Sequence, residues 1–320
     1  MRRCAAVLAM LRAAAAIVPR TRWQPQAERH LARVTKLLGA APDVAAAQSK
    51  DNPLLNFVFT YYGSDLGAAA NLGRWCPPVG VAIEASQDDR ERLWRGIESD
   101  GAYDPRKLPK KRLAALERGR AALAATRKRP PIWHCYGLHE WAMLYRPDGA
   151  PQPHKHQSLP LRVDQATINR VVEADEIKCT HFDAFRFFAP EATDKNRHAL
   201  TRQTQLDHEQ PACVHANMDL LRYALRLAPF VDASLIGDAL DVALQARDLD
   251  IRASPYLLAG AAPVEVETTA GRKEYVRRQA AVHDAAAPVR DRLLAAYDDF
   301  FLAHALVPDA RADSEAKLVV

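Results

Sequence analysis

The chain has 320 residues, of which 48% are hydrophobic and 26% are charged, a composition typical of a globular protein with a sizeable core. No run of about eighteen apolar residues is free of charge, so we expect no membrane-spanning helix and no membrane partner. The net charge of +5 permits a polyanionic partner without requiring one.

The first 22 residues form an N-terminal extension that is rich in arginine and alanine and contains no acidic residue. This composition is typical of an organellar transit peptide, although an upstream start codon in a GC-rich gene would give the same pattern. The five cysteines are widely spread and form no CxxC pair, which favours a reducing compartment over a disulfide framework or a structural zinc finger. We therefore expect a cytoplasmic protein, or an organellar one if residues 1–22 are a transit peptide.

Residues 23–130 predict a helical N-terminal part. Residues 22–38 have a helical pattern, and residues 79–84 form a candidate strand after two prolines. Residues 105–129 carry ten Lys or Arg against one acidic residue on a helical pattern of leucines. Such a segment is typical of a solvated helix face, and it is also the pattern of a surface that binds the phosphates of duplex DNA.

Residues 131–307 predict a mixed part that carries the candidate site, and residues 308–320 predict a frayed tail. Asp164 and the proline at position 211 are typical of helix starts. The expected elements are helices at 137–145, 164–174, 211–228, 232–250 and 271–303, and strands at 159–163, 177–187 and 264–268. The sequence therefore predicts an α+β fold, predominantly helical with a small sheet, as a single large globular unit.

Three groups of chemically capable residues lie between positions 134 and 219. His139 and Glu140 belong to the first group. In the second, Cys179, His181 and Asp183 would share one face of an extended segment. The third contains residues 209, 215 and 219, of which the last two lie four apart on a helix. There the carboxylate would either orient the imidazole or, on an exposed helix face, merely pair with Arg222.

Buried histidines and thiols are often ordinary core residues, but three such groups in under ninety residues predict one shared site. We expect at least four of the following seven residues around a single cavity: His139, Glu140, His181, Asp183, Glu209, His215 and Asp219. The sequence matches none of three well-known catalytic motifs. Met143 stands where the zinc-protease motif HExxH needs its second histidine, and the sequence has no Gly-rich phosphate loop and no GxSxG elbow.

Several stretches resemble a bacterial family, common in actinomycetes, that usually carries the label 3-methyladenine DNA glycosylase. The likeness covers about residues 50–295 and rests on the segments 59–62, 137–143, 159–162, 181–188, 209–219, 252–256 and 274–277. The sequence lacks the spaced Cys and His ligands of the zinc-containing 3-methyladenine glycosylases and the Gly-rich hairpin of the helix-hairpin-helix glycosylases. It also departs from the family pattern at Leu257, where an aspartate is expected.

The resemblance implies a DNA-repair N-glycosylase for alkylated purines that needs no cofactor. In this hypothesis Asp183 or Asp219 faces the sugar, aromatic side chains stack the base, and residues 105–129 contact duplex DNA. The candidate catalytic residues are Asp183, Asp219, His181, His215, Glu209 and Glu140, and the candidate substrate-binding residues are Trp141, Tyr136, Arg186 and Asn217.

The same residues are also compatible with a metal-dependent oxidase or hydrolase of a small molecule. Mixed imidazole and carboxylate ligands suit iron, manganese or zinc. The candidate ligands are His139, Glu140, His181, Asp183, Glu209 and His215. A non-enzymatic binding protein is the third alternative.

Overall fold

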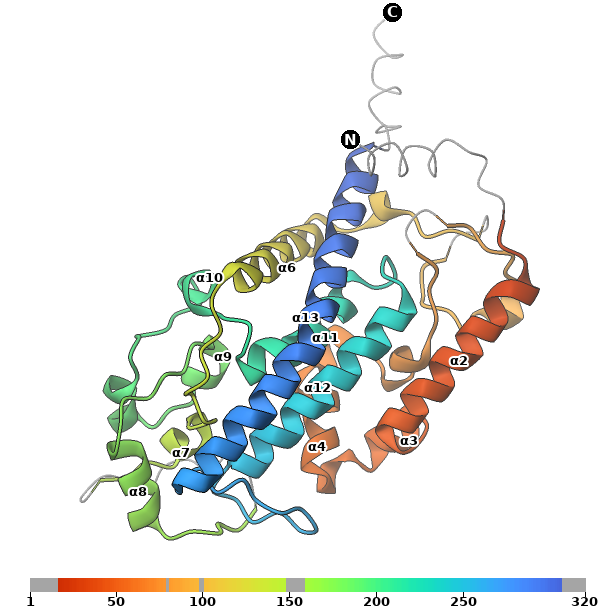
Figure 1. Ribbon diagram of the computed structural model, residues 1–320. Coiled ribbons are helices and arrows are strands. Elements are labelled where there is room, and N and C mark those ends of the chain that lie inside the picture. Colours follow the sequence, from red (N-terminus) through yellow and green to blue (C-terminus); the bar gives the residue numbers. More distant parts are fainter. Residues whose placement is uncertain (1–16, 79–80, 98–100, 148–158, 307–320) are drawn as a thin grey trace, which may run out of the picture.

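The computed structural model describes residues 17–78, 81–97, 101–147 and 159–306, and within these the chain folds into one helical unit of twelve α-helices (Figure 1). Residues 1–16 of the expected N-terminal extension lie outside the described residues, and so does the expected frayed tail, residues 308–320. Among the described helices, none has the length and apolar character needed to cross a membrane.

The expected small sheet is wrong for the described residues, where pairing is limited to four isolated bridges. A sheet needs several consecutive pairs between neighbouring extended segments, whereas here the chain turns away after a single pair. The bridges join Val18 to Ile83, Trp75 to Leu93, Leu161 to Tyr256, and Ile177 to Asn196. Three of the four expected strands, at 79–84, 159–163 and 177–187, thus contribute one bridge each, and residues 264–268 contribute none.

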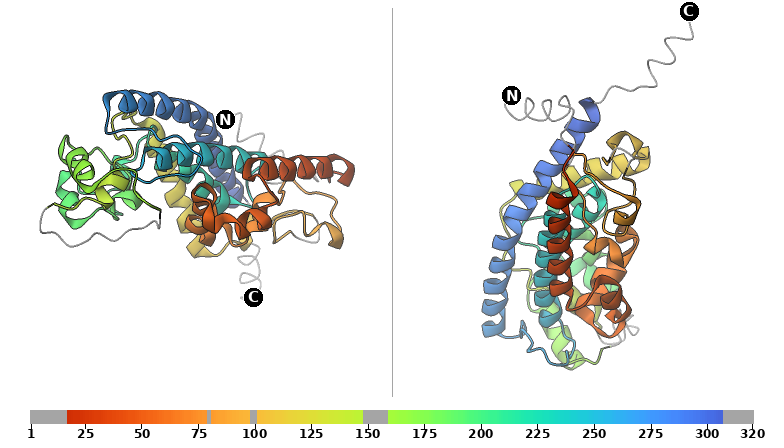
Figure 2. Two further views of the ribbon diagram at one scale, coloured as in Figure 1. Left: turned by 90° about the horizontal axis from the view of Figure 1, so that it is seen from below. Right: turned by 90° about the vertical axis from the view of Figure 1, so that its right-hand side faces the viewer.

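Three long helices form the centre of the molecule: α11 (Val214–Leu227), α12 (Ala233–Ala253) and α13 (Thr269–Leu306). Asp232 caps α12, because its side chain accepts a hydrogen bond from the Ser234 backbone N–H at 2.7 Å. Helix α12 runs between α13 and α2 (Arg20–Leu38), as both views show (Figures 1 and 2).

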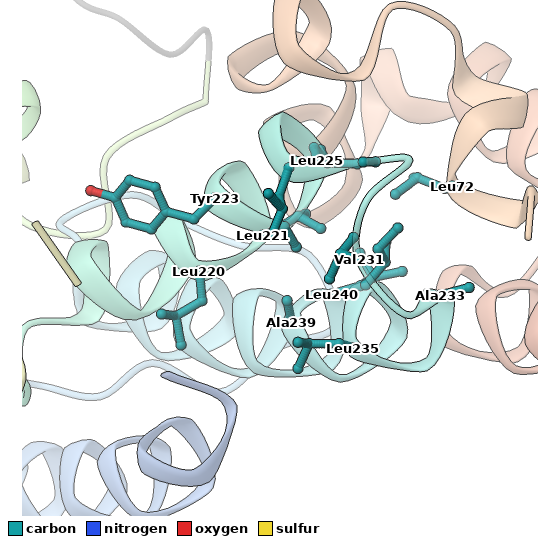
Figure 3. Packing of buried hydrophobic residues seen from close by; sticks show 14 of the residues in the cluster. Leu72, Leu220, Leu221, Tyr223, Leu225, Val231, Ala233, Leu235, Ala239 and Leu240 are labelled. Carbon is teal, nitrogen blue, oxygen red and sulfur yellow. The ribbon is translucent and has the colours of Figure 1, made fainter. Parts of the chain in front are cut away.

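Helices α11 and α12 pack through leucine and alanine side chains that are almost completely buried (Figure 3). Most residues of both helices are buried, because the helices are covered on several sides. The cluster includes Leu220, Leu221, Leu225, Leu235, Ala239 and Leu240. Residues of α11, α12 and α13 belong to this core and also to a second core under α7 and α8, so the two parts of the chain share a common framework.

The elements between α2 and the basic helix at residues 110–128 lie on one side of this framework and are short helical segments (Figure 1). Asn52 caps α4 by accepting hydrogen bonds from the backbone of Leu54 and Leu55. A π-helical turn follows α4 and carries Tyr61 towards α11. The elements are α3 (Pro42–Ala47), η1 (Ser49–Asp51), α4 (Pro53–Asn56), the π-turn η2 (Phe57–Tyr61), α5 (Gly63–Leu66), η3 (Ala69–Gly73), η4 (Gln87–Asp89) and η5 (Pro105–Lys107).

The basic segment forms helix α6 (Lys110–Lys128), whose inner face packs against α13. Arg120 and Arg127 form ion pairs with Asp298 and Asp291 on α13, at 2.6 and 2.7 Å. The remaining exposed cations of the helix are Lys110, Lys111, Arg112, Arg118 and Lys128. The expectation of a solvated basic face is therefore confirmed, whereas binding of duplex DNA by residues 105–129 stays a prediction.

On the other side of the framework lie the short helices that carry most of the expected site (Figure 1). They are α7 (His139–Met143), α8 (Gln165–Glu173), α9 (Phe182–Phe185), η6 (Pro190–Lys195) and α10 (Gln205–His208). The predicted N-cap of α8 is confirmed, because Asp164 accepts a hydrogen bond from the Thr167 backbone at 2.8 Å. The chain is extended only as far as His181, where α9 begins, so the long strand expected at 177–187 does not form.

Candidate metal centre and cavity

A cavity of about 570 Å³ lies where the N-terminal turn η2 meets α7, α9, α11 and α12. This volume is in the range of pockets that bind small molecules. Its apolar wall includes Phe57, Met143, Leu159, Phe187 and Met218, and its polar wall includes Lys50, Asn56, Thr60, Tyr61, His139, Glu140, Asp183, His215, Asp219 and Arg247.

The structure brings the three sequence groups together at this cavity. Five of the seven expected residues line it, namely His139, Glu140, Asp183, His215 and Asp219. His181 and Glu209 are buried directly behind Asp219. The expected convergence is therefore present in the fold, whereas the chemical roles of these residues stay predictions.

A buried group of two imidazoles and one carboxylate lies at the junction of α7, α11 and α12. His139 Nε2 is 2.7 Å from Asp250 Oδ1, and His215 Nε2 is 3.9 Å from the same oxygen. The two imidazole rings meet edge to face with centroids 4.4 Å apart. One ligand atom from each of the three residues lies within 4.8 Å of the other two, which is close enough for a single metal ion to bind all three.

The pKa values in this group are displaced in opposite directions. Burial works to lower the pKa of His139, but the charge and hydrogen bond of Asp250 raise it above its ordinary value. Burial lowers the pKa of His215 well below its ordinary value, and the neighbouring His139 lowers it further. Burial works to raise the pKa of Asp250, but His139 and His215 hold it far below its usual range. This lowering of its pKa favours the neutral imidazole of His215, the form that binds metals.

Two polar atoms at this centre are left without a partner. His139 Nδ1 and Glu140 Oε2 are both buried, and neither has a hydrogen-bond partner among the described residues. Buried polar atoms are normally paired, so an unpaired carboxylate oxygen next to His139 on the cavity wall fits a site that takes up a cation or a polar substrate.

The turn that leads into α7 has an unusual backbone. Tyr136 has a φ of 49°, in the left-handed region that side chains rarely adopt, and Gly137 follows with a φ of 65°. A Cβ atom at Gly137 would lie 3.4 Å from the ring of Tyr275. This double left-handed turn brings His139 and Glu140 to the cavity, and such strain is most common at functional sites.

A second charged network borders the other end of the cavity, around Arg222 of α11. Its Nη1 donates to Asp219 Oδ2 at 2.8 Å and to Asp183 Oδ2 at 3.2 Å. The guanidinium also lies over the ring of Tyr61, 4.5 Å from the centroid. Arg202 adds a 2.8 Å hydrogen bond to Asp183 Oδ1. Both carboxylates therefore face the cavity with their charge balanced.

The expectation that Asp219 orients His215 is wrong. Asp219 faces His181, whose Nε2 lies 3.3 Å from Asp219 Oδ2 and 3.5 Å from Glu209 Oε1. Burial works to lower the pKa of His181, but the Asp219 hydrogen bond and the Glu209 charge raise it. Burial also raises the pKa of Glu209. The rings of His181 and His215 stack with centroids 5.3 Å apart, which connects this network to the metal group.

The candidate substrate-binding residues do not line the cavity. Trp141 is completely buried and donates its indole N–H to the Ala253 carbonyl at 2.8 Å. Tyr136 packs against Tyr275, and Asn217 accepts a hydrogen bond from Arg290 on the far side of α11. Arg186 is exposed and pairs with the outer side of Asp183 at 3.3 Å.

The expected shared face of Cys179, His181 and Asp183 is also wrong. Cys179 lines a much smaller void of about 20 Å³ together with Cys135 and Cys213. The chain becomes helical after His181, so Asp183 no longer has the alternating orientation of the extended residues before it.

Asp250 is the site residue that sequence analysis missed. Its position does carry a signal, because α12 has a completely buried stripe with helical spacing: Ala239, Ala243, Ala246, Asp250 and Ala253. A carboxylate on a stripe of alanines must be paired or must bind a metal. Arg247, one turn earlier, was also missed.

Comparisons of the chain with protein-family models, with curated proteins and with solved structures gave no match. Its function must therefore be inferred from the chemistry of its own residues.

Proposed function

We propose that the chain is a metal-dependent enzyme that acts on a small molecule in this cavity, with His139, His215 and Asp250 as the metal ligands. The observation that carries the proposal is that ligand atoms of these three residues lie within 4.8 Å of one another, with the two imidazoles at the wall of the 570 Å³ cavity and Asp250 buried behind them. Two imidazoles and a carboxylate suit iron, manganese or zinc.

Three protein ligands leave coordination positions for water or substrate. This is the arrangement of hydrolytic zinc sites and of oxygen-activating iron sites, so the bound metal decides between a hydrolase and an oxidase. Glu140 lies beside the ligand His139 and lines the cavity with an unpaired oxygen. It would accept a proton from a substrate or from water there.

Metal analysis of the purified protein tests this proposal. We expect about one metal ion per chain, and we expect His215→Ala to weaken its binding by more than about 100-fold because a direct ligand is lost. His283→Ala is the matched control, since His283 lies on α13 beside an exposed Asp284 and is not part of the group. A wild-type protein that binds none of the three metals, or a His215→Ala protein that binds them unchanged, would refute the proposal.

The second candidate is the DNA N-glycosylase that the family resemblance implies. It is favoured by the carboxylate of Asp183 in a cavity walled by Phe57, Tyr61 and Phe187, since an extruded base is held by stacking next to an acid. In this hypothesis Asp183→Asn abolishes release of methylated purine from alkylated duplex DNA and leaves the metal content unchanged. Metal binding without base release from the wild-type protein would exclude this candidate.

A further inference from the structure

Arg247 has hydrogen-bonding capacity that the fold does not use. It lies on α12 one turn before Asp250, and its Nη1 donates to Asp250 Oδ2 at 2.6 Å. This is the one hydrogen bond that its guanidinium makes to the described residues, and its Nε is buried without a partner. An arginine has five N–H donors in a fixed plane, and a buried donor without an acceptor is unfavourable. The side chain is 11% exposed and lines the cavity.

The charges around Arg247 favour an anion. Lys50 is exposed on the wall of the same cavity. The carboxylates of Asp183 and Asp219 at the other end are already paired with Arg222. The carboxylates at this end are Asp250 and Glu140. A divalent cation at the proposed centre would balance both of them, and the charge left from Arg247 and Lys50 would then be positive.

We propose that the substrate of this site carries a carboxylate or phosphate group, which Arg247 binds through its free N–H donors with Lys50 at the cavity wall. Planar guanidinium donors match the oxygen atoms of both groups, often with two parallel hydrogen bonds. This inference rests on the proposed function, because it places the anionic group beside the metal centre. It also names the class of substrate, a small organic anion.

Calorimetric titration of the metal-loaded protein tests the inference with three probes: inorganic phosphate, oxalate, and oxamide, the neutral counterpart of oxalate. We expect binding of at least one of the two anions and not of oxamide. Arg247→Met should weaken anion binding by about tenfold to a hundredfold, the usual loss for a charge-assisted hydrogen bond. Arg252→Met is the matched control, since Arg252 lies on the same helix and pairs with Asp248 at 2.8 Å outside the cavity.

Metal content is measured on every variant, so that loss of the metal and loss of the anion site are separated. Unchanged anion affinity in Arg247→Met with its metal retained would overturn the inference, as would equal binding of oxamide or no binding of either anion.

If the wild-type protein binds no metal, the proposed function fails, and the same titrations on metal-free protein still decide the role of Arg247. If Arg247→Met does not fold, Lys50→Met replaces it. That change at the cavity wall should weaken anion binding by about twofold to fivefold, and an unchanged affinity would count against the inference.

Discussion

His139 Nε2 and Asp250 Oδ1 lie 2.7 Å apart although 111 residues separate them in the chain. The contact joins α7, which carries the first group of site residues, to the central helix α12. Both side chains are buried, and Arg247 holds the second carboxylate oxygen at 2.6 Å. In the metal-free protein this relationship is a buried ion pair, and a bound metal would replace it with coordination by both residues.

The first prediction concerns the stability of the metal-free protein. Asp250→Asn keeps the shape of the side chain but leaves His139 and Arg247 buried without their counter-charge, so the free energy of unfolding should fall by about 3–5 kcal/mol. Urea denaturation in the presence of a chelator measures this. Asp248→Asn is the control, because that carboxylate is 38% exposed, and it should change stability by no more than about 0.5 kcal/mol. Equal effects of the two changes would contradict the prediction.

The second prediction concerns pH. The pKa of His181 is raised above 6.5 in the folded protein. Its contribution to stability is therefore fully present below about pH 6.5 and is lost as the pH rises through its folded pKa. The loss is about 1.4 kcal/mol for each pH unit by which folding raises the pKa. The stability advantage of wild-type protein over His181→Gln should be larger at about pH 5.5 than at about pH 8.5. Urea unfolding of both metal-free proteins at the two pH values measures the difference, and an advantage that grows with pH would show that His181 is neutral in the fold.

The third prediction compares two arginines of α11. Arg222 pairs with Asp219 and Asp183 in a buried setting, so Arg222→Met should lower the free energy of unfolding by about 3–5 kcal/mol. Arg226 pairs with Asp65 at 2.8 Å but is 36% exposed, so Arg226→Met should cost no more than about 1 kcal/mol. Denaturation curves measured side by side give both values. A smaller loss for Arg222 than for Arg226 would mean that the buried network does not hold the cavity wall.

The fourth prediction tests the basic helix α6 as a DNA-binding surface. Lys110, Lys111 and Arg118 are exposed, whereas Arg112 donates to the backbone carbonyl of Arg226 at 3.1 Å and is partly structural. If duplex DNA binds here, replacing the first three with Ala should reduce the slope of log affinity against log salt by about three units. Fluorescence anisotropy with a duplex at several salt concentrations measures the slope. No binding at low salt would remove the main physical support for the glycosylase candidate.

Several helices could be predicted because their signals are local. Asp164 and Asp232 cap the helices that follow them, and capping depends only on residues two or three positions away. The helical periodicity of 22–38 and 211–228 predicted α2 and α11 to within three residues at each end. The strands were wrong because an extended segment becomes part of a sheet only when another segment pairs with it, and that partner is a matter of tertiary structure.

Some residues of the candidate site could likewise be predicted from the sequence, and others could not. The sequence by itself identified His139 and His215, because imidazoles near carboxylates are recognisable in any fold. Only the tertiary structure decided that Asp250, rather than Asp219, completes the group with them. The two carboxylates are chemically equivalent in the sequence. What distinguishes them is the packing of α7 and α11 on α12, which places Asp250 between the imidazoles and turns Asp219 towards Arg222 and away from His215.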